Sequence, residues 1–116
     1  MSHTPVAQVL ALSGGVGGAK LVAGLARVVT GDSLCVVVNT GDDFEHFGLY
    51  ISPDLDSVLY ALGGHNDVDR GWGRAGETWR FMAALSQLST ATWFQRGDQD
   101  LAMHVYRTWR LRQGAR

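Results

Sequence analysis

The sequence predicts an α/β protein with a Rossmann-like open parallel sheet flanked by helices. Two short apolar runs, 6–12 and 34–38, have the composition of buried parallel strands. Between them lie a glycine-rich stretch, 13–20, and a segment of helical period, 20–29, which Gly31 is expected to close as a glycine cap. A strand, a helix and a second strand in this order form a right-handed crossover, so we expect the two strands to be parallel.

Length and composition indicate one domain covering residues 1–116. Hydrophobic residues make up 46% and charged residues 18% of the chain, as in ordinary globular proteins. The net charge of -1 gives no electrostatic reason to expect a nucleic-acid partner. No apolar run approaches the ~18 residues that span a bilayer, and the N-terminus lacks the pattern of a signal peptide. Cys35, the single cysteine, falls in a predicted strand and is expected to be a buried structural thiol, so the sequence favours a cytoplasmic protein.

The glycine-rich stretch follows the first predicted strand and resembles two phosphate-binding patterns without matching either. Gly15 and Gly17 fit the dinucleotide pattern, but Lys20 occupies its third glycine position, whereas Gly14 and Lys20 alone fit the P-loop pattern. Backbone amides at a glycine-rich helix N-terminus bind anions, so a phosphate site is predicted, although a tight turn without a ligand remains the alternative. The candidate phosphate-binding residues are Gly14, Gly15, Gly17, Gly18 and Lys20.

Polar residues follow the second predicted strand directly. Asn39, Thr40 and Gly41 lie at the carboxyl edge of the sheet, where ligands of open α/β sheets bind, and we assign them to substrate binding. Rossmann enzymes usually place an acid near this point for the ribose hydroxyls. An amide there argues against an ordinary NAD site.

Four aspartates lie close together in the sequence after this edge. Asp42 and Asp43 follow a Thr-Gly turn, and Asp54 and Asp56 stand in the first turn of a predicted helix. The two pairs are expected to converge on one crevice, where carboxylate oxygens suit Mg²⁺ and phosphoryl-type transfer. The alternative is ordinary turn chemistry for the first pair and a favourable helix dipole for the second.

The predicted second helix opens at Ser52-Pro53 and stops at Gly63-Gly64. Helical spacing predicts a buried stripe that turns Leu55 inward and leaves Asp54 and Asp56 on either side of it. The stripe consists of Leu55, Val58, Leu59 and Leu62.

The last part of the chain is predicted to hold a polar loop at 65–76, a third helix at 77–88, a short third strand at 92–95 and a final helix. Asp98 is the expected N-cap of that final helix.

Five sequence pieces, in order, resemble the 2-phospho-L-lactate transferases of coenzyme F-420 biosynthesis. They are Ser-Gly-Gly-Val-Gly-Gly-Ala-Lys at 13–20, Val-Asn-Thr-Gly-Asp-Asp at 38–43, Ser-Pro-Asp-Leu-Asp at 52–56, Gly-Trp-Gly at 71–73, and Trp-Phe with Gly-Asp-Gln-Asp-Leu-Ala-Met-His at 93–104. Gln99 departs from the family, which usually has a basic residue there. Members of the family also continue well past the length of this chain, so the chain resembles the N-terminal portion of a larger domain.

The resemblance implies a transferase reaction with Mg²⁺ as cofactor. A ribityl hydroxyl of the deazaflavin Fo attacks the distal phosphorus of a guanosine-diphosphate-linked donor carrying phospholactate or phosphoenolpyruvate, and GMP leaves. The glycine stretch then holds the donor phosphates and Asp42 and Asp43 bind the metal. Asp54, with Asp56 beside it, is assigned to the catalytic role of orienting or deprotonating the hydroxyl. Neither a membrane nor nucleic acid is an expected partner, and a homo-oligomer is possible.

Two alternatives stay open at this point. A related family with a similar glycine-rich start binds nucleotide-linked sugars, so the chain is alternatively a regulatory binding module without transferase chemistry. The second alternative is an inactive fragment that keeps the fold. The Ser-Pro-Asp-Leu-Asp and Gly-Trp-Gly pieces favour the transferase.

Overall fold

The computed structural model describes residues 8–116 and divides the chain into two compact units. The first unit comprises residues up to 42 together with 52–66, and the second comprises 43–51 and 67–116. Positions 6 and 7 of the predicted first strand lie outside the described residues. Each unit is described separately.

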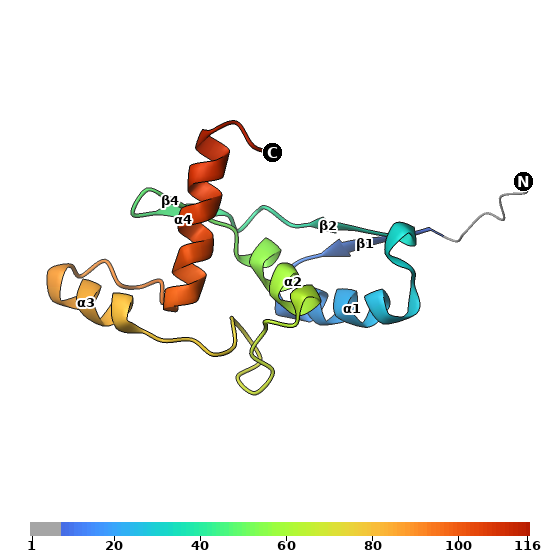
Figure 1. Cartoon of the computed structure of the whole chain (residues 1–116), viewed down its shortest axis with the longest axis horizontal. Coiled ribbons are helices and arrows are strands. Elements are labelled where there is room, and N and C mark those ends of the chain that lie inside the picture. The colour runs from blue at the N-terminus through green and yellow to red at the C-terminus, as the bar shows by residue number, and fades with distance from the viewer. Residues whose placement is uncertain (1–7) are drawn as a thin grey trace, which may run out of the picture. The chain divides into compact units, whose positions relative to one another are not determined.

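The first unit carries the predicted crossover. Strands β1 and β2 are parallel and in register from the Val9–Leu34 pair to the Ser13–Val38 pair. Helices α1 and α2 flank this sheet (Figure 1), so the Rossmann-like fold class is confirmed. The elements are β1 Val9–Ser13, α1 Gly15–Val28, β2 Leu34–Val38 and α2 Pro53–Gly63.

Small and β-branched residues form the core of the first unit. Ala19 and Val22 of α1 pack with Ala11 of β1 and Val58 of α2, and Val22 is fully buried. Short side chains at these positions let the helix backbones approach the sheet closely.

Helix α1 begins five residues earlier than predicted. The stretch expected to be a glycine loop is its first turn, starting at Gly15, because glycine accepts helical as well as left-handed backbone angles. Gly15 itself has φ +70°, which favours glycine, and an added Cβ on Gly18 would lie 2.5 Å from Ser13 Oγ. Two of these glycines therefore have structural roles in the turn and in helix packing.

The predicted glycine cap at Gly31 is wrong. The chain leaves α1 through Val29 in an extended conformation, and Gly31–Ser33 forms a short 3-10 turn before β2. Val29 and Thr30 are β-branched and prefer extended backbone to a helical continuation, so no left-handed residue is needed to stop the helix.

Both ends of α2 are as predicted, but its buried face matches the predicted stripe only at Val58. Ser52 occupies the N-cap position before Pro53, and Gly64 ends the helix in the left-handed conformation. Leu55 is exposed, whereas Asp54 and Asp56 are buried. A helical pattern identifies an apolar stripe but cannot show that a polar partner outside the helix draws a carboxylate inward. Leu59 and Leu62 of the predicted stripe are also exposed.

The second unit contains two helices and a hairpin, and the hairpin was not predicted from the sequence. Strands β3 Phe44–His46 and β4 Leu49–Ile51 are antiparallel, joined by Phe47 at φ 52° and Gly48 at φ 72°. Two successive positive φ values suit the tight two-residue turn of a hairpin. The unit also holds α3 Arg80–Leu88 and α4 Asp98–Arg112.

The predicted strand at 92–95 is wrong. This segment has no regular secondary structure, and it joins the hairpin through side chains. The Phe44 ring lies 5.4 Å from that of Trp93 and 5.1 Å from that of Phe94, measured between centroids. The aromatic side chains of this segment therefore pack against β3 without forming a strand.

Helices α3 and α4 cap each other. The Asp98 carboxylate accepts hydrogen bonds from the backbone of Arg80 and Phe81 at 3.2 and 2.9 Å, at the start of α3. The Glu77 carboxylate accepts from the backbone of Gln99 and Asp100 at 2.9 and 3.0 Å, at the start of α4. These long-range partners explain two corrections.

The third helix begins at residue 80 and not at 77, because Glu77 is engaged with α4. The N-cap of α4 is Gly97, whereas Asp98 is the first helical residue and caps α3. Each carboxylate satisfies two amides that a helix end leaves without intrahelical partners.

No helix in residues 8–116 combines the length and apolar character needed to cross a membrane.

Candidate functional site

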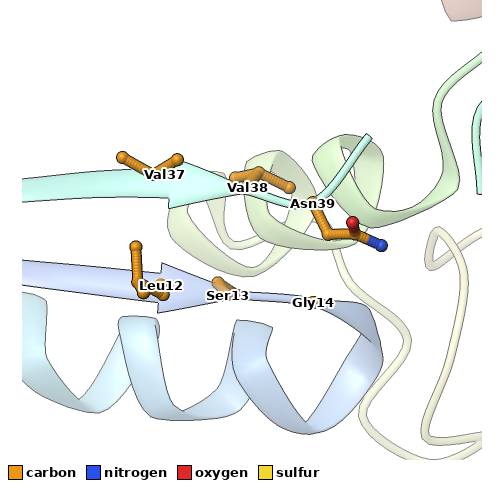
Figure 2. A pocket seen from close by; sticks show the side chains of 6 residues that line it. All are labelled: Leu12, Ser13, Gly14, Val37, Val38 and Asn39. Carbon is orange, nitrogen blue, oxygen red and sulfur yellow. The ribbon is translucent and has the colours of Figure 1, made fainter. Parts of the chain in front are cut away.

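The site forms where β1 and β2 end at the same edge of the sheet. The backbone N–H of Asn39 donates to the carbonyl of Ser13 at 2.8 Å, which continues the parallel pairing past both strands. A shallow cavity of about 330 Å³ opens here (Figure 2), at the edge where open α/β sheets bind ligands. It is lined by Leu12, Ser13, Gly14, Val37, Val38 and Asn39.

Asn39 links the cavity to the second helix. Its amide nitrogen donates to Asp54 Oδ2 at 2.9 Å, and its amide oxygen accepts from the backbone N–H of Gly41 at 3.1 Å. The two bonds fix the orientation of the amide group, because its two ends play different roles. Asp54 is only 6% exposed, so this hydrogen bond explains how its carboxylate is accommodated in a buried position.

Gly14 is the third member of this arrangement. A Cβ built on it would lie 3.5 Å from the Cβ of Asn39 and 3.8 Å from Asp54 Oδ2. The structure thus brings three predicted site residues together from three separate segments: the turn before α1, the end of β2 and the start of α2.

The N-terminus of α1 has no side-chain cap and no acidic residue in its first turn. The first-turn amides of a helix lack intrahelical partners, and Gly14 at the N-cap of α1 has no side chain that could cap them. Helices α3 and α4, by contrast, receive the carboxylates of Asp98 and Glu77. An uncapped, glycine-rich helix start beside a cavity has the chemistry of a phosphate site. Lys20, on the same helix, is exposed.

Ser13 is a site residue that the sequence analysis left out of its candidate set. Its hydroxyl is buried and has no hydrogen-bond partner among residues 8–116. The residue lines the cavity. Buried hydroxyls usually have a hydrogen-bond partner, so this one needs a ligand or an ordered water molecule. In the sequence, the available signal was a polar residue that ends an apolar strand just before a glycine run.

The remaining predicted site residues are not among those that line the cavity. Thr40 and Asp42 are exposed, and the side chain of Asp42 makes no hydrogen bond or ion pair within the part of the chain that the structure describes. Asp43 belongs to the second unit, and Asp56 is buried in α2. The convergence of the two aspartate pairs remains a prediction.

The residues at this edge fit a magnesium ion by the chemistry of their donors. Asp42 and Asp54 offer carboxylate oxygens, the ligands that Mg²⁺ prefers, and no sulfur or imidazole ligand lines the cavity. Asn39 engages one oxygen of Asp54 and leaves the other oxygen for a further contact. Asp42 and Asp43 stay the predicted ligands of the ion, and Asp54 keeps its predicted catalytic role.

The second unit contains a separate polar cluster around Arg96 and His46. Arg96 is almost fully buried, lies over the rings of Phe81 and Phe94, and donates to His46 Nδ1. His46 Nε2 in turn contacts the carbonyl of Ala91 at 3.1 Å. Burial, together with the charge of Arg96, lowers the pKa of His46. We therefore describe His46 as a neutral imidazole that accepts at Nδ1 and donates at Nε2.

His104 of α4 is also buried. Its Nε2 contacts Asp100 Oδ2 at 3.1 Å, one turn earlier on α4. Within the second unit it thus belongs to the packed face of that helix.

Fold and site together define an α/β protein with a Rossmann-like parallel sheet and a cavity at the carboxyl edge of its strands. The family model described as 2-phospho-L-lactate transferase CofD matches residues 9–116. The chain belongs to this family, as the five sequence pieces predicted.

Curated relatives carry the name phosphoenolpyruvate transferase. The chain is 44% identical to the protein of Nocardia farcinica (strain IFM 10152) over 108 residues, which is 92% of this chain and 32% of that protein. It is 44% identical to the protein of Kitasatospora aureofaciens over 109 residues, or 92% and 34% of the two chains. For Mycobacterium marinum (strain ATCC BAA-535 / M), identity is 45% over 115 residues, or 89% and 35%. The chain spans about a third of the length of these relatives.

Proposed function

We propose that this chain contributes the donor-binding edge of a transferase in coenzyme F-420 biosynthesis. The donor is a guanosine-diphosphate-linked three-carbon acid, either phosphoenolpyruvate or phospholactate, and the acceptor is the deazaflavin Fo. The observation that carries the proposal is the uncapped glycine start of α1 beside the cavity that Asn39 and Ser13 line. Family membership and the relatives' names support the same class of reaction.

In the proposed reaction, a ribityl hydroxyl oxygen of Fo forms a bond to the distal phosphorus of the donor. The bond between that phosphorus and the bridging oxygen breaks, and GMP leaves with the electron pair. The hydroxyl proton passes to a carboxylate, for which Asp54 is the first candidate and Asp56 the second. The amides at the start of α1, with Gly14 and Gly17 leaving room for the phosphates, offset the negative charge on the donor.

A magnesium ion, when bound, would supply positive charge to the phosphate oxygens as the bond breaks. Asp42 and Asp43 are the proposed ligands. Asn39 would keep the Asp54 carboxylate in one orientation, through the 2.9 Å hydrogen bond, so that its second oxygen is presented to the acceptor. Ser13 would donate its otherwise unpartnered hydroxyl to a donor phosphate.

The test combines binding with turnover on the same protein. Isothermal titration calorimetry measures GDP affinity in the presence of Mg²⁺, and chromatography measures GMP released from the donor and Fo. Asp42→Asn or Asp43→Asn should raise the Mg²⁺ concentration required, because an amide oxygen is a poorer ligand for a hard cation. Asp54→Asn should lower turnover while donor affinity is largely kept.

Each outcome distinguishes one function from another. Donor binding without GMP release in the presence of Fo would favour a nucleotide-binding module of the related family. Normal turnover in all three aspartate variants would mean that these aspartates have only structural roles, in the turn and at the start of α2. An absence of both binding and turnover in the unaltered chain would contradict the proposal.

A further inference from the structure

One face of the parallel sheet in the first unit is apolar and uncovered. Leu10 and Leu12 of β1 are 64% and 77% exposed, Val37 of β2 is 51% exposed, and Cys35 is exposed as well. The strand register places Leu10 opposite Cys35 and Leu12 opposite Val37. The four side chains therefore form one contiguous surface, which we name the sheet patch.

The exposure of Cys35 corrects the expectation of a buried thiol. Side chains alternate along a strand, and the neighbours of the patch residues point to the opposite face, where Ala11 and Val36 pack with the core of α1 and α2. Figure 2 shows Leu12 and Val37 turned away from α1. Both α1 and α2 thus pack on the same face of the sheet.

An uncovered apolar face is unusual for this type of sheet. Parallel sheets occur almost only with both faces covered, and their strands are apolar on both sides for that reason. The apolar sequence of β2, Leu-Cys-Val-Val-Val, fits such a doubly covered strand. The patch contains no charged side chain, so it suits an apolar helix face rather than a charged partner.

We propose that the sheet patch binds the polypeptide segment by which the relatives extend beyond the part that this chain matches. The Nocardia farcinica protein has 68% of its length outside the match, since the match covers 32% of it. A segment of that size is long enough to cover the second face of the sheet. Its chemistry at the contact is an amphipathic helix with an apolar stripe.

The same segment would complete the candidate site. Leu12 and Val37 belong both to the sheet patch and to the lining of the cavity beside Asn39. A helix laid on the patch therefore forms a further wall of that cavity and raises its affinity for nucleotide. This second consequence rests on the proposed function, whereas binding of the segment does not.

The experiment pairs the tagged full 116-residue chain with the unmatched segment of the Nocardia farcinica protein, co-expressed so that the two polypeptides fold together. We expect a 1:1 complex by light scattering. Cys35 is the only cysteine and reports on the patch directly. A thiol reagent should label it rapidly in the free chain and at least tenfold more slowly in the complex.

Charged substitutions locate the contact. Leu12→Lys and Val37→Lys should each weaken the complex at least tenfold, because a lysine on the patch must be desolvated when the helix binds. Val28→Lys is the matched control in the same unit, since Val28 is 80% exposed at the end of α1 and outside the patch. Circular dichroism verifies that all three variants keep their helix content.

Three results would overturn the proposal: a segment that accumulates with the tagged chain but is not retained by it, a Cys35 that is already protected in the free chain, or equal binding by the patch and control variants. GDP calorimetry on the complex separates this proposal from the proposed function. A complex that forms through the patch but binds no GDP would contradict only the proposed function.

Discussion

Gly17 and Gly18 are adjacent in the first turn of α1, yet the structure assigns them different roles. A Cβ on Gly18 would lie 2.5 Å from Ser13 Oγ and 3.3 Å from Ser13 Cα, whereas a Cβ on Gly17 would meet nothing within 4 Å. Alanine at either position gains helix propensity. Only alanine at Gly18 must push β1 and α1 apart.

The comparison of Gly18→Ala with Gly17→Ala isolates the cost of crowding. Replacing glycine by alanine inside a helix stabilises by about 1 kcal/mol, and this gain is shared by the two variants. Overpacking a core contact costs about 1–3 kcal/mol. We therefore expect Gly18→Ala to be less stable than Gly17→Ala by about 1–3 kcal/mol, with Gly17→Ala at or above the stability of the unaltered chain.

Urea unfolding followed by far-UV circular dichroism, with amide exchange in α1, measures this difference. Tryptophan fluorescence does not, because Trp72, Trp79, Trp93 and Trp109 all lie in the second unit. Adding Ser13→Ala to Gly18→Ala removes the nearest atom and should recover about 1 kcal/mol. Equal stabilities for the two glycine variants would refute the reasoning.

The same pair separates packing from ligand binding. If donor phosphates approach the start of α1, a methyl group at Gly17 should weaken GDP binding although it stabilises the fold. Gly17→Ala is a sharper probe than Gly15→Val, because Gly15 has φ +70° and any side chain there strains the backbone.

Three further predictions concern hydrogen bonds and titration. Asn39→Ala should destabilise the first unit by about 1–3 kcal/mol, because the buried Asp54 carboxylate loses its hydrogen-bond donor, and Asn39→Asp should be no more stable than Asn39→Ala. Urea unfolding that shows the same stability for these variants and the unaltered chain would contradict this prediction. Hydrogen bonds from Thr78 and Phe81 lower the pKa of Asp98, so the stability that its carboxylate contributes is complete above pH of about 4 and is lost as pH falls through the lowered pKa. Amide exchange at α3, measured over a pH series, should show this acid-dependent loss in the unaltered chain but not in Asp98→Asn. Burial and Arg96 lower the pKa of His46, so stability should fall as pH drops below about 6.5 until the lowered pKa is reached. When unfolding is followed by fluorescence, His46→Phe should flatten this dependence of stability on pH, and the exposed control His65→Gln should keep it.

The elements that the sequence predicted are those encoded by local chemistry. Apolar runs identified β1 and β2, and Pro53 and Gly64 stand where the start and stop of α2 require them. The parallel pairing followed from the crossover rule. These features depend on neighbours within a few residues, which a single sequence displays.

The errors have long-range causes. Asp98 looks like the cap of its own helix until Arg80 and Phe81 are known to lie next to its carboxylate. Likewise, Asp54 is buried because Asn39, fifteen residues earlier, donates to it, and helical periodicity carries no record of that bond. Glycine also signals both a loop and a close helix contact, so the start of α1 was placed too late.

The candidate site shows the same division. Gly14, Asn39 and Asp54 were named from the sequence and do converge, because the strand order fixes which edge they share. Ser13 was left out, since its significance lies in a buried hydroxyl without a partner, which only a structure reveals.

A GDP titration, with Mg²⁺ present and followed by amide NMR, tests most directly whether the start of α1 binds phosphate. We predict saturable shifts of the Gly15, Gly17 and Gly18 amides and of the Asn39 side-chain amide, at the carboxyl edge of the sheet. Amides at the opposite end of the strands, such as those of Val9 and Cys35, should stay in place. Shifts confined to that opposite end or to the second unit, or no shifts at saturating nucleotide, would contradict the claim that the start of α1 is the phosphate site.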